Sequence, residues 1–191
     1  MDERGDATPT GRTRRQLLGL AAAGAVGLAG CTSLPGSGAE GSGDPSTAGT
    51  AADRRDVIRV ETLAVGGSPG GQVALRPPDR PALLDFFATW CAPCIPQMET
   101  LRAVRSAFTP EELHMVSVTS EADETAVREF WRRHDGTWPV ATDPRSRAVR
   151  EHSVTGVPTL LVVLPDGTVT WRHTGLAGRE TLREQVEQVV G

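Results

Sequence analysis

The chain has 191 residues, of which 38% are hydrophobic, and a formal net charge of −4 at pH 7. This length and apolar content suit one domain of ordinary size with extensions. The slightly acidic balance provides no basic surface for nucleic acid, so we expect no nucleic-acid partner.

The first 31 residues resemble an export signal. Two adjacent arginines, Arg14 and Arg15, stand directly before an apolar stretch rich in Ala and Gly at residues 17–30. As a helix this stretch would cover roughly 21 Å, which is too short to cross a hydrocarbon core of roughly 30 Å. The paired arginines resemble those of a Tat signal, which implies export of the folded protein.

The cysteine at position 31 ends the sequence LAGC, which resembles a lipobox. That resemblance implies that Cys31 is lipidated and anchors the protein at the extracytoplasmic face of the cell membrane. The alternative is a plain secretory signal with an incidental cysteine. Residues 32–56 are small or polar, with almost no large apolar side chain, so we expect a flexible linker before a domain at residues 57–191.

The first half of this domain predicts two short strands, a long buried strand and a helix. Residues 57–63 alternate in polarity and predict a strand, which a glycine-rich turn at 66–71 joins to a second strand at 72–75. The nearly continuous apolar run at 82–88 predicts a strand that is buried on both faces. Apolar residues at helical spacing predict that a helix opens at the two following cysteines and buries Ile95, Met98, Leu101, Val104 and Phe108.

The second half predicts further strands alternating with helices. Strands are expected at 113–118, 138–141, 160–164 and 168–173, the last two joined by a turn at 165–167. Helices are expected after the capping residue Asp123, at 144–152, and at the C-terminus, where Leu182 and Val186 share a face. This order predicts an α/β domain with a mixed sheet.

Cys91 and Cys94 form a pair separated by two residues, for which three uses have to be distinguished. A structural zinc site needs four ligands, usually in two short-spaced pairs; the chain has no second pair and its histidines are scattered, so we expect no metal. A structural disulfide at this spacing closes so small a loop that it removes little entropy from the unfolded chain. A redox-active disulfide, which needs no other cofactor, fits best.

A helix N-terminus favours this redox chemistry, because its N–H groups and dipole stabilise a thiolate and lower the pKa of the thiol. We expect Cys91 to be exposed and to attack a substrate disulfide, and Cys94 to be shielded and to resolve the mixed disulfide. Pro93 has a fixed φ that suits a first helical turn and stiffens the pair. Trp90 is expected to form a surface ring beside Cys91; the alternative is that it fills the core.

Asp85 lies inside the apolar strand, six residues before Cys91. Burial raises the pKa of a carboxyl group, so Asp85 is a candidate for proton exchange with Cys94. The alternative is an aspartate at the end of the strand that faces water.

Two stretches, LLDFFATWCAPC at 83–94 and GVPT at 156–159, resemble the thioredoxin superfamily, and within it the membrane-anchored, extracytoplasmic TlpA- and ResA-type branch. The resemblance covers about residues 57–190. It implies a thioredoxin-like fold, with a mixed central sheet flanked by helices, an N-terminal hairpin and a central insertion around 120–145.

The same resemblance implies how a substrate is held. It implies a cis peptide bond between Val157 and Pro158, and pairing of the Val157 backbone with an extended substrate chain. Two positions depart from many relatives: Gln97 stands where a Glu is common, and Glu99 where a Pro is common.

The activity implied by the resemblance is that of a thiol–disulfide oxidoreductase outside the cytoplasm. Its substrates would be disulfide-containing proteins, such as apocytochrome c or proteins of metal-centre assembly; a membrane thiol donor would supply electrons, and a monomer is the default. The dipeptide Ala92–Pro93 has no His to stabilise the thiolate, so we favour a reductant over an oxidase or isomerase. A copper metallochaperone that binds Cu(I) through Cys91 and Cys94 is the alternative from another class.

Overall fold

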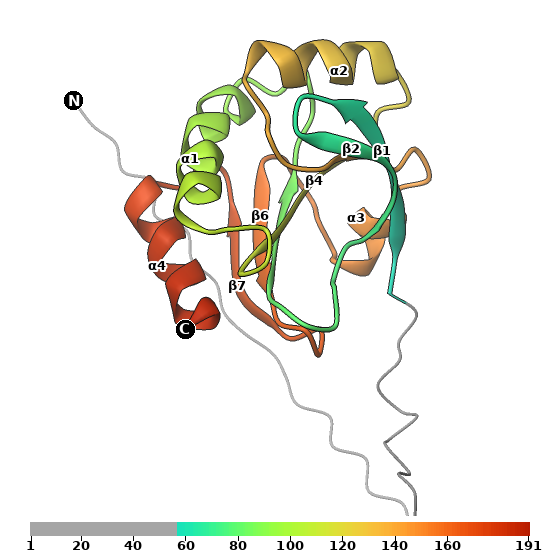
Figure 1. Ribbon diagram of the computed structural model, residues 1–191. Coiled ribbons are helices and arrows are strands. Elements are labelled where there is room, and N and C mark those ends of the chain that lie inside the picture. The colour runs from blue at the N-terminus through green and yellow to red at the C-terminus, as the bar shows by residue number, and fades with distance from the viewer. Residues whose placement is uncertain (1–56) are drawn as a thin grey trace, which may run out of the picture. The chain divides into compact units, whose positions relative to one another are not determined.

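A seven-stranded mixed sheet organises residues 57–191, the part of the chain that the computed structural model describes (Figure 1). Across the sheet the strands are β2 (Ser68–Ala74), β1 (Arg59–Val65), β5 (Val140–Thr142), β4 (His114–Thr119), β3 (Ala82–Phe86), β6 (Thr159–Val163) and β7 (Val169–Thr174). The central strands β3, β4 and β5 run parallel, and the pairs toward both edges are antiparallel. The expected mixed sheet is confirmed.

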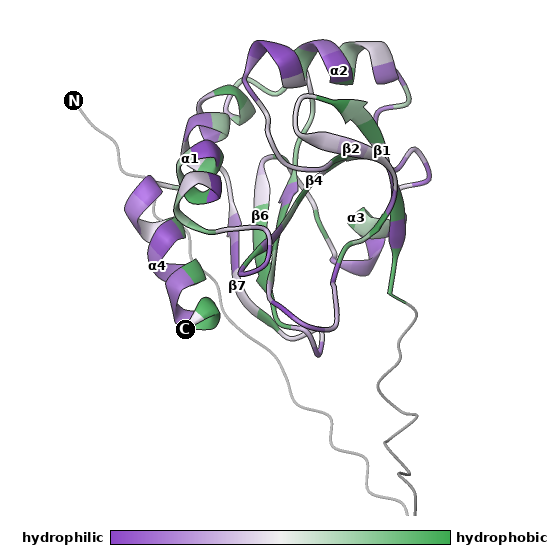
Figure 2. Ribbon diagram, viewed as in Figure 1, coloured by the Kyte–Doolittle hydropathy of each residue, from purple (hydrophilic) through white to green (hydrophobic). Residues whose placement is uncertain are grey.

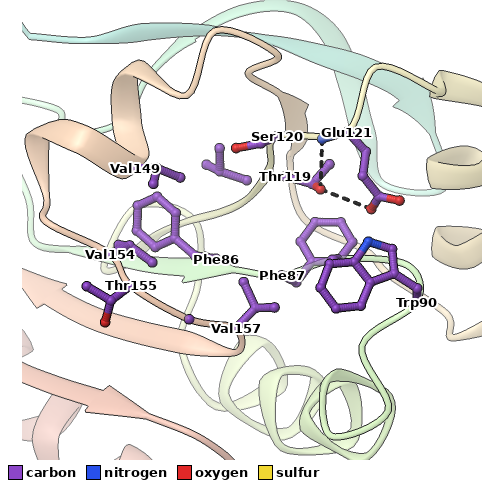
Figure 3. A pocket seen from close by; sticks show the side chains of 13 residues that line it. Phe86, Phe87, Trp90, Thr119, Ser120, Glu121, Val149, Val154, Thr155 and Val157 are labelled. Carbon is purple, nitrogen blue, oxygen red and sulfur yellow. Dashed lines mark hydrogen bonds between the residues drawn. The ribbon is translucent and has the colours of Figure 1, made fainter.

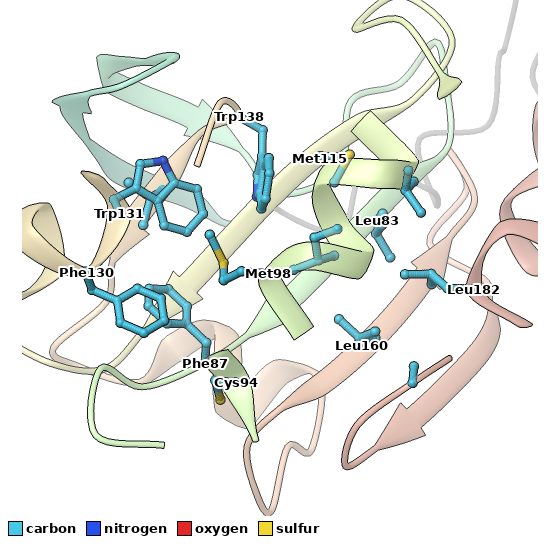
Figure 4. Close-up of a cluster of buried hydrophobic side chains, with 14 of the residues drawn as sticks. Leu83, Phe87, Cys94, Met98, Met115, Phe130, Trp131, Trp138, Leu160 and Leu182 are labelled. Carbon is cyan, nitrogen blue, oxygen red and sulfur yellow. The ribbon is translucent and has the colours of Figure 1, made fainter. Parts of the chain in front are cut away.

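Four helices cover this sheet: α1 (Cys94–Ala107), α2 (Glu124–Arg133), α3 (Arg147–Glu151) and α4 (Arg179–Val190). The larger core cluster contains residues of α1, α2 and α4, and Figure 4 shows its side chains. A second cluster lies between the sheet and α3. Figure 2 shows hydrophilic residues along α2 and α4, as expected for helices with one face in solvent.

Strand β3 lies at the centre of both cores. Leu83 and Phe87 belong to the larger cluster, whereas Leu84 and Phe86 belong to the second, because successive side chains of a strand point to opposite faces. The apolar run therefore does form a strand that is buried on both faces. Its carboxyl end leads directly to Cys91.

The segment between β4 and α3 forms the expected insertion. Asp123 caps α2 by accepting hydrogen bonds from the backbone N–H groups of Thr125 and Ala126, at 3.0 and 3.1 Å. Strand β5 then lies between β4 and β1, so this segment joins the N-terminal hairpin to the rest of the sheet. The helix predicted at 144–152 is shorter and comprises Arg147–Glu151.

The N-terminal hairpin differs from the prediction in its turn. β2 begins at Ser68 instead of residue 72, and Val65 pairs with Ser68, so the turn is only Gly66–Gly67. A Cβ atom on Gly66 would collide with the backbone oxygen of Gly136, and one on Gly67 with the backbone oxygen of Thr137. The two glycines allow this close approach of two backbones, which sequence spacing could not show.

Helix α1 begins at Cys94, three residues later than predicted, with Pro93 as its N-cap. The backbone N–H of Cys94 donates to the carbonyl of Cys91 at 3.1 Å, so residues 91–94 form a tight turn. Ile95, expected in the core, is 46% exposed because it lies beside the buried stripe that runs through Cys94, Met98 and Leu101.

Within residues 57–191, none of the helices has the length and apolar character that crossing a membrane requires. The signal at 1–31 and the linker at 32–56 lie outside the described residues and stay predictions.

Candidate active site

A disulfide joins Cys91 to Cys94 between the end of β3 and the start of α1. The two Cα atoms are 5.3 Å apart, within the usual range for a disulfide. The backbone N–H of Cys91 donates to the carbonyl of Ala88 at 3.2 Å, which fixes the turn that leads into the pair. Ala92 and Pro93, between the two cysteines, are exposed.

The expectation that Cys91 is exposed was wrong. Cys91 is 3% exposed and Cys94 is 2% exposed, and both belong to the larger core cluster together with Phe87. The Cys91 sulfur is bonded to the sulfur of Cys94, which is itself buried in the first turn of α1. Trp90 is 75% exposed and forms the surface ring that the sequence predicted.

The segment around Pro158 lies next to the turn that carries the cysteines. Phe86 of β3 pairs with Thr159 of β6, so the residues just before Thr159 lie beside those just after Phe86. The Val157–Pro158 peptide bond is cis, as the resemblance implied. Among residues 57–191, the Val157 backbone makes no backbone hydrogen bond, while the Pro158 carbonyl accepts one from Gly175 at 2.8 Å.

An apolar groove of about 580 Å³ opens beside this segment (Figure 3). Trp90 and Val157 stand at its rim in Figure 3, and Val149 and Val154 line it from α3 and the loop after it. Neither cysteine is among its lining residues. The groove therefore continues the surface beside the disulfide without enclosing it.

The loop before the cysteines is held by Glu121, a residue that no motif in the sequence indicates. One carboxylate oxygen accepts a hydrogen bond from the backbone N–H of Thr89, and the other from the Thr89 hydroxyl, both at 2.7 Å. Thr119 donates a third at 3.1 Å. These contacts join the loop after β4 to the loop that positions Trp90.

Asp85, the last residue but one of β3, is 2% exposed, so it does not face water. It stands two residues from both Leu83 and Phe87 and therefore points to the same face of the sheet as they do, toward the larger cluster, which contains Cys94. Burial raises the pKa of the Asp85 carboxyl to about 7, although a hydrogen bond from Ser117 opposes this. Its Oδ1 atom is buried and has no hydrogen-bond partner within residues 57–191.

Two further residues that form a hydrogen-bond chain to Asp85 were not recognised from the sequence. Ser117 pairs with Asp85 across the β3–β4 ladder, and its hydroxyl donates to Asp85 Oδ2 at 2.6 Å. The indole N–H of Trp138 donates to Ser117 Oγ at 2.9 Å. The available signal was Ser117 as a polar residue in the middle of the apolar run 115–118, but only the strand register brings it to Asp85.

Gln97, which the resemblance marked as a departure from the expected Glu, is buried in the first turns of α1. Its Oε1 accepts a hydrogen bond from the backbone N–H of Ala177 at 2.8 Å, which joins α1 to the loop before α4. No cluster of three or more His, Cys, Asp or Glu side chains suited to a metal occurs in the described part of the chain.

Comparison with known proteins gives a family match over most of the chain. The sequence model of the Redoxin family matches residues 51–190. The thiol-disulfide oxidoreductase ResA of a Bacillus cereus strain is 26% identical over 106 residues, which are 56% of this chain and 61% of that relative. The chain thus spans somewhat less than two thirds of the length of this relative.

Solved structures give the same fold. StoA from Bacillus subtilis superposes with a TM-score of 0.59 at 20% identity, covering 68% of this chain and 95% of that one. A secreted Mycobacterium tuberculosis disulfide oxidoreductase homologous to E. coli DsbE superposes with a TM-score of 0.60 at 22% identity, covering 72% and 100%. These likenesses establish the thioredoxin-like fold that the sequence predicted.

Proposed function

Because this chain belongs to the Redoxin family, we propose that it is a thiol–disulfide oxidoreductase whose Cys91–Cys94 pair reduces disulfides in extracytoplasmic proteins. The observation that carries the proposal is the disulfide between these cysteines, placed between a buried strand and the N-terminus of α1. The helix dipole there favours a thiolate over a thiol.

The reaction begins with the reduced pair. The Cys91 thiolate attacks one sulfur of the substrate disulfide, forms a mixed disulfide and releases the first substrate thiolate. Cys94 then loses its proton to Asp85 and attacks the Cys91 sulfur, which closes the protein disulfide and releases the second substrate thiolate. The substrate gains two electrons and the pair loses two.

Substrate binding is proposed to use the Val157 backbone and the groove beside it. An extended substrate segment would pair with the free N–H and C=O of Val157, as in strand addition. The neighbouring groove is mostly apolar and would accept an apolar side chain of the same segment. We propose that the protein acts as a monomer on disulfide-containing proteins.

The reducing direction requires a source of electrons, for which we propose a membrane thiol donor. A strong oxidant of this class has a reduced form that is stabilised. The dipeptide Ala92–Pro93 contains no His that would stabilise the reduced form in this way, which favours a reductant. The reduction potential of the pair in defined thiol buffers tests the direction. A value near about −270 mV supports a reductant, whereas a value near about −120 mV reverses the direction.

The proposed location rests on residues outside the described part of the chain. We propose Tat-type export directed by Arg14 and Arg15, and lipidation of Cys31 at the extracytoplasmic face of the membrane. Radiolabelled palmitate should enter the wild-type protein and be absent from Cys31→Ala; label retained in that variant contradicts the anchor.

The activity is tested by trapping the mixed disulfide. Cys94→Ala, incubated with a disulfide-containing protein such as insulin, should accumulate a covalent complex through Cys91 that thiols dissolve. Cys91→Ala should form no complex and should not reduce insulin. A Cys91→Ala protein that reduces insulin at the wild-type rate would refute the proposed function.

A further inference from the structure

A chain of two hydrogen bonds reaches Asp85 through the core. It runs from Trp138 Nε1 to Ser117 Oγ, 2.9 Å, and from Ser117 Oγ to Asp85 Oδ2, 2.6 Å. All three residues are buried. Trp138 comes from the insertion and Ser117 from β4, so two elements outside the cysteine motif fix one side of this carboxyl group.

The direction of the chain follows from its donors. An indole N–H only donates, so Ser117 Oγ accepts from Trp138 and its single hydrogen is left for Asp85. A carboxylate accepts that hydrogen at Oδ2. The bond survives protonation of Asp85 without rearrangement only if the new proton is bound at Oδ1, which has no partner within residues 57–191.

We propose that Ser117 and Trp138 are positioning residues for disulfide exchange: they hold Oδ2 of Asp85 and so assign proton exchange with Cys94 to Oδ1. This inference rests on the proposed function. It concerns the second step, in which Cys94 gives up its proton. It also means that Trp138, which lies in the insertion, helps to position the proton acceptor.

Within the larger core cluster that Asp85 faces, the residues that titrate are Cys91 and Cys94. Residues that share this core from the neighbouring elements are Met98 and Leu101 of α1, Met115 of β4 and Leu160 of β6, none of which titrates. Burial and the Ser117 hydrogen bond are the influences on the pKa of Asp85, with no charged residue contributing. The cysteines of the pair titrate in this core once the disulfide is reduced.

Protons and electrons both balance in the proposed step. In the mixed disulfide, Oδ1 of the Asp85 carboxylate takes the proton of the Cys94 thiol. The resulting thiolate attacks Cys91 Sγ, the Cys91–Cys94 bond forms, and the bond from Cys91 to the substrate breaks. The substrate sulfur leaves with the electron pair, and Asp85 later returns its proton to solvent.

A second buried tryptophan offers a matched control. Trp131 is as buried as Trp138, and their rings pack edge to face with centroids 5.0 Å apart. The Trp131 indole N–H, however, has no hydrogen-bond partner within residues 57–191. Replacing either ring by Phe removes similar volume, but only Trp138→Phe breaks the chain to Asp85.

The test follows the reduced Cys31→Ala protein, whose two remaining cysteines are Cys91 and Cys94, after mixing with one equivalent of the aromatic disulfide DTNB. Attack by Cys91 releases one coloured thiolate, and resolution by Cys94 releases the second, so absorbance separates the two steps. In the wild type the rate of the second step should rise with pH as Asp85 ionises. Ser117→Ala removes a hydrogen bond that favours the carboxylate, so this profile should move up by about one pH unit, roughly tenfold slower at pH 6.

The variants separate positioning from structure. Trp138→Phe should shift the pH profile of the second step upward by less than Ser117→Ala does. Ser117→Thr keeps the hydroxyl and should have the wild-type profile. Trp131→Phe should leave the profile unchanged. In an Asp85→Asn background Ser117→Ala should have no further effect on the second step. Should Ser117→Ala fail to fold, Trp138→Phe against Trp131→Phe decides the matter.

The outcomes distinguish this inference from the function on which it rests. Normal release of two thiolates with the same pH profile in wild type, Ser117→Ala and Trp138→Phe overturns the inference and leaves the function standing. A wild-type protein from which Cys91 releases no thiolate overturns both. An equal shift in Trp131→Phe and Trp138→Phe also overturns the inference, because it would show a general effect of core packing.

Discussion

Glu121 and Thr89, which are 32 positions apart in the chain, are joined by two hydrogen bonds of 2.7 Å each, one to the Thr89 backbone and one to its hydroxyl. The carboxylate thereby ties the loop after β4 to the loop that carries Trp90 and leads to Cys91. These two hydrogen bonds fix one side of the groove beside the disulfide.

Removing the Glu121–Thr89 hydrogen bonds should lower the free energy of unfolding. Glu121→Ala leaves the Thr89 N–H without its charged acceptor and should reduce the free energy of unfolding by about 1–2 kcal/mol, since the site is partly exposed. Glu121→Gln keeps one acceptor oxygen and should lose less. Denaturant unfolding of both variants measures the difference; equal stability of Glu121→Ala and wild type would contradict it.

Asp85 should make stability depend on pH. Its pKa in the folded protein, about 7, lies above the ordinary value of 3.8, so the folded state holds a proton that the unfolded state releases between these values. The stabilisation is therefore complete below pH 3.8 and is lost as pH rises to about 7, on the order of 4 kcal/mol from Asp85 alone. Asp85→Asn should flatten this slope.

The measurement is denaturant unfolding of the oxidised protein at several values between about pH 4 and about pH 8, a range that contains nearly all of the interval between the two pKa values, 3.8 and about 7. Keeping the disulfide closed removes the cysteines from the titration. Between low pH and pH 7, Asp85→Asn should lose less of its stability than the wild type does. A wild-type slope that persists in Asp85→Asn would assign the effect to another group.

Gln97 should stabilise the junction of α1 with the loop before α4. Gln97→Met keeps the side-chain volume but removes the acceptor for the buried N–H of Ala177, and should reduce the free energy of unfolding by about 1–3 kcal/mol. Gln97→Glu keeps the acceptor. Because burial raises the pKa of a carboxyl group, this variant should lose stability as pH rises, and unfolding at low and high pH would reveal whether it does.

Gly136 should not tolerate a side chain. A Cβ there would overlap the Trp131 ring, which is fully buried and cannot move aside cheaply. Gly136→Ala should reduce the free energy of unfolding by about 1–3 kcal/mol. Gly178→Ala, where the nearest atom to the new Cβ is 4.0 Å away, is the control and should lose less than about 1 kcal/mol. Equal thermal midpoints of the two variants would contradict the clash.

The sequence predicted those features that local chemistry determines. The apolar run before Cys91 predicted a strand buried on both faces, and Asp123 predicted a helix start, because each rests on residues adjacent in the chain. The start of α1 was predicted three residues too early. The sequence pattern does not distinguish a separate turn at residues 91–94 from the first turn of the helix itself. The burial of Cys91 is that of the disulfide-bonded pair, whose partner Cys94 is itself buried, and spacing alone does not show which redox form the pair takes.

The supporting residues of the site could not be predicted because they depend on tertiary register. Ser117 meets Asp85 only through the β3–β4 ladder, and Trp138 reaches Ser117 only because β5 lies beside β4. Glu121 reads in the sequence as one of many exposed acids. Its role appears only when the loop after β4 is placed against Thr89.

The sheet ends in β2 on one side and β7 on the other, and the chemistry of these two borders discourages one molecule from adding to the next. β2 carries Pro69, which has no N–H to offer, followed by Gly70 and Gly71 in left-handed conformations that interrupt a regular ladder. On the other side Arg172 places a charge within β7. The pairing of β7 with β6 is also irregular, because its register shifts between Val162 and Val163. Both borders use features that oppose the addition of one sheet edge to the next, so the oxidised domain should stay dispersed at high local concentration.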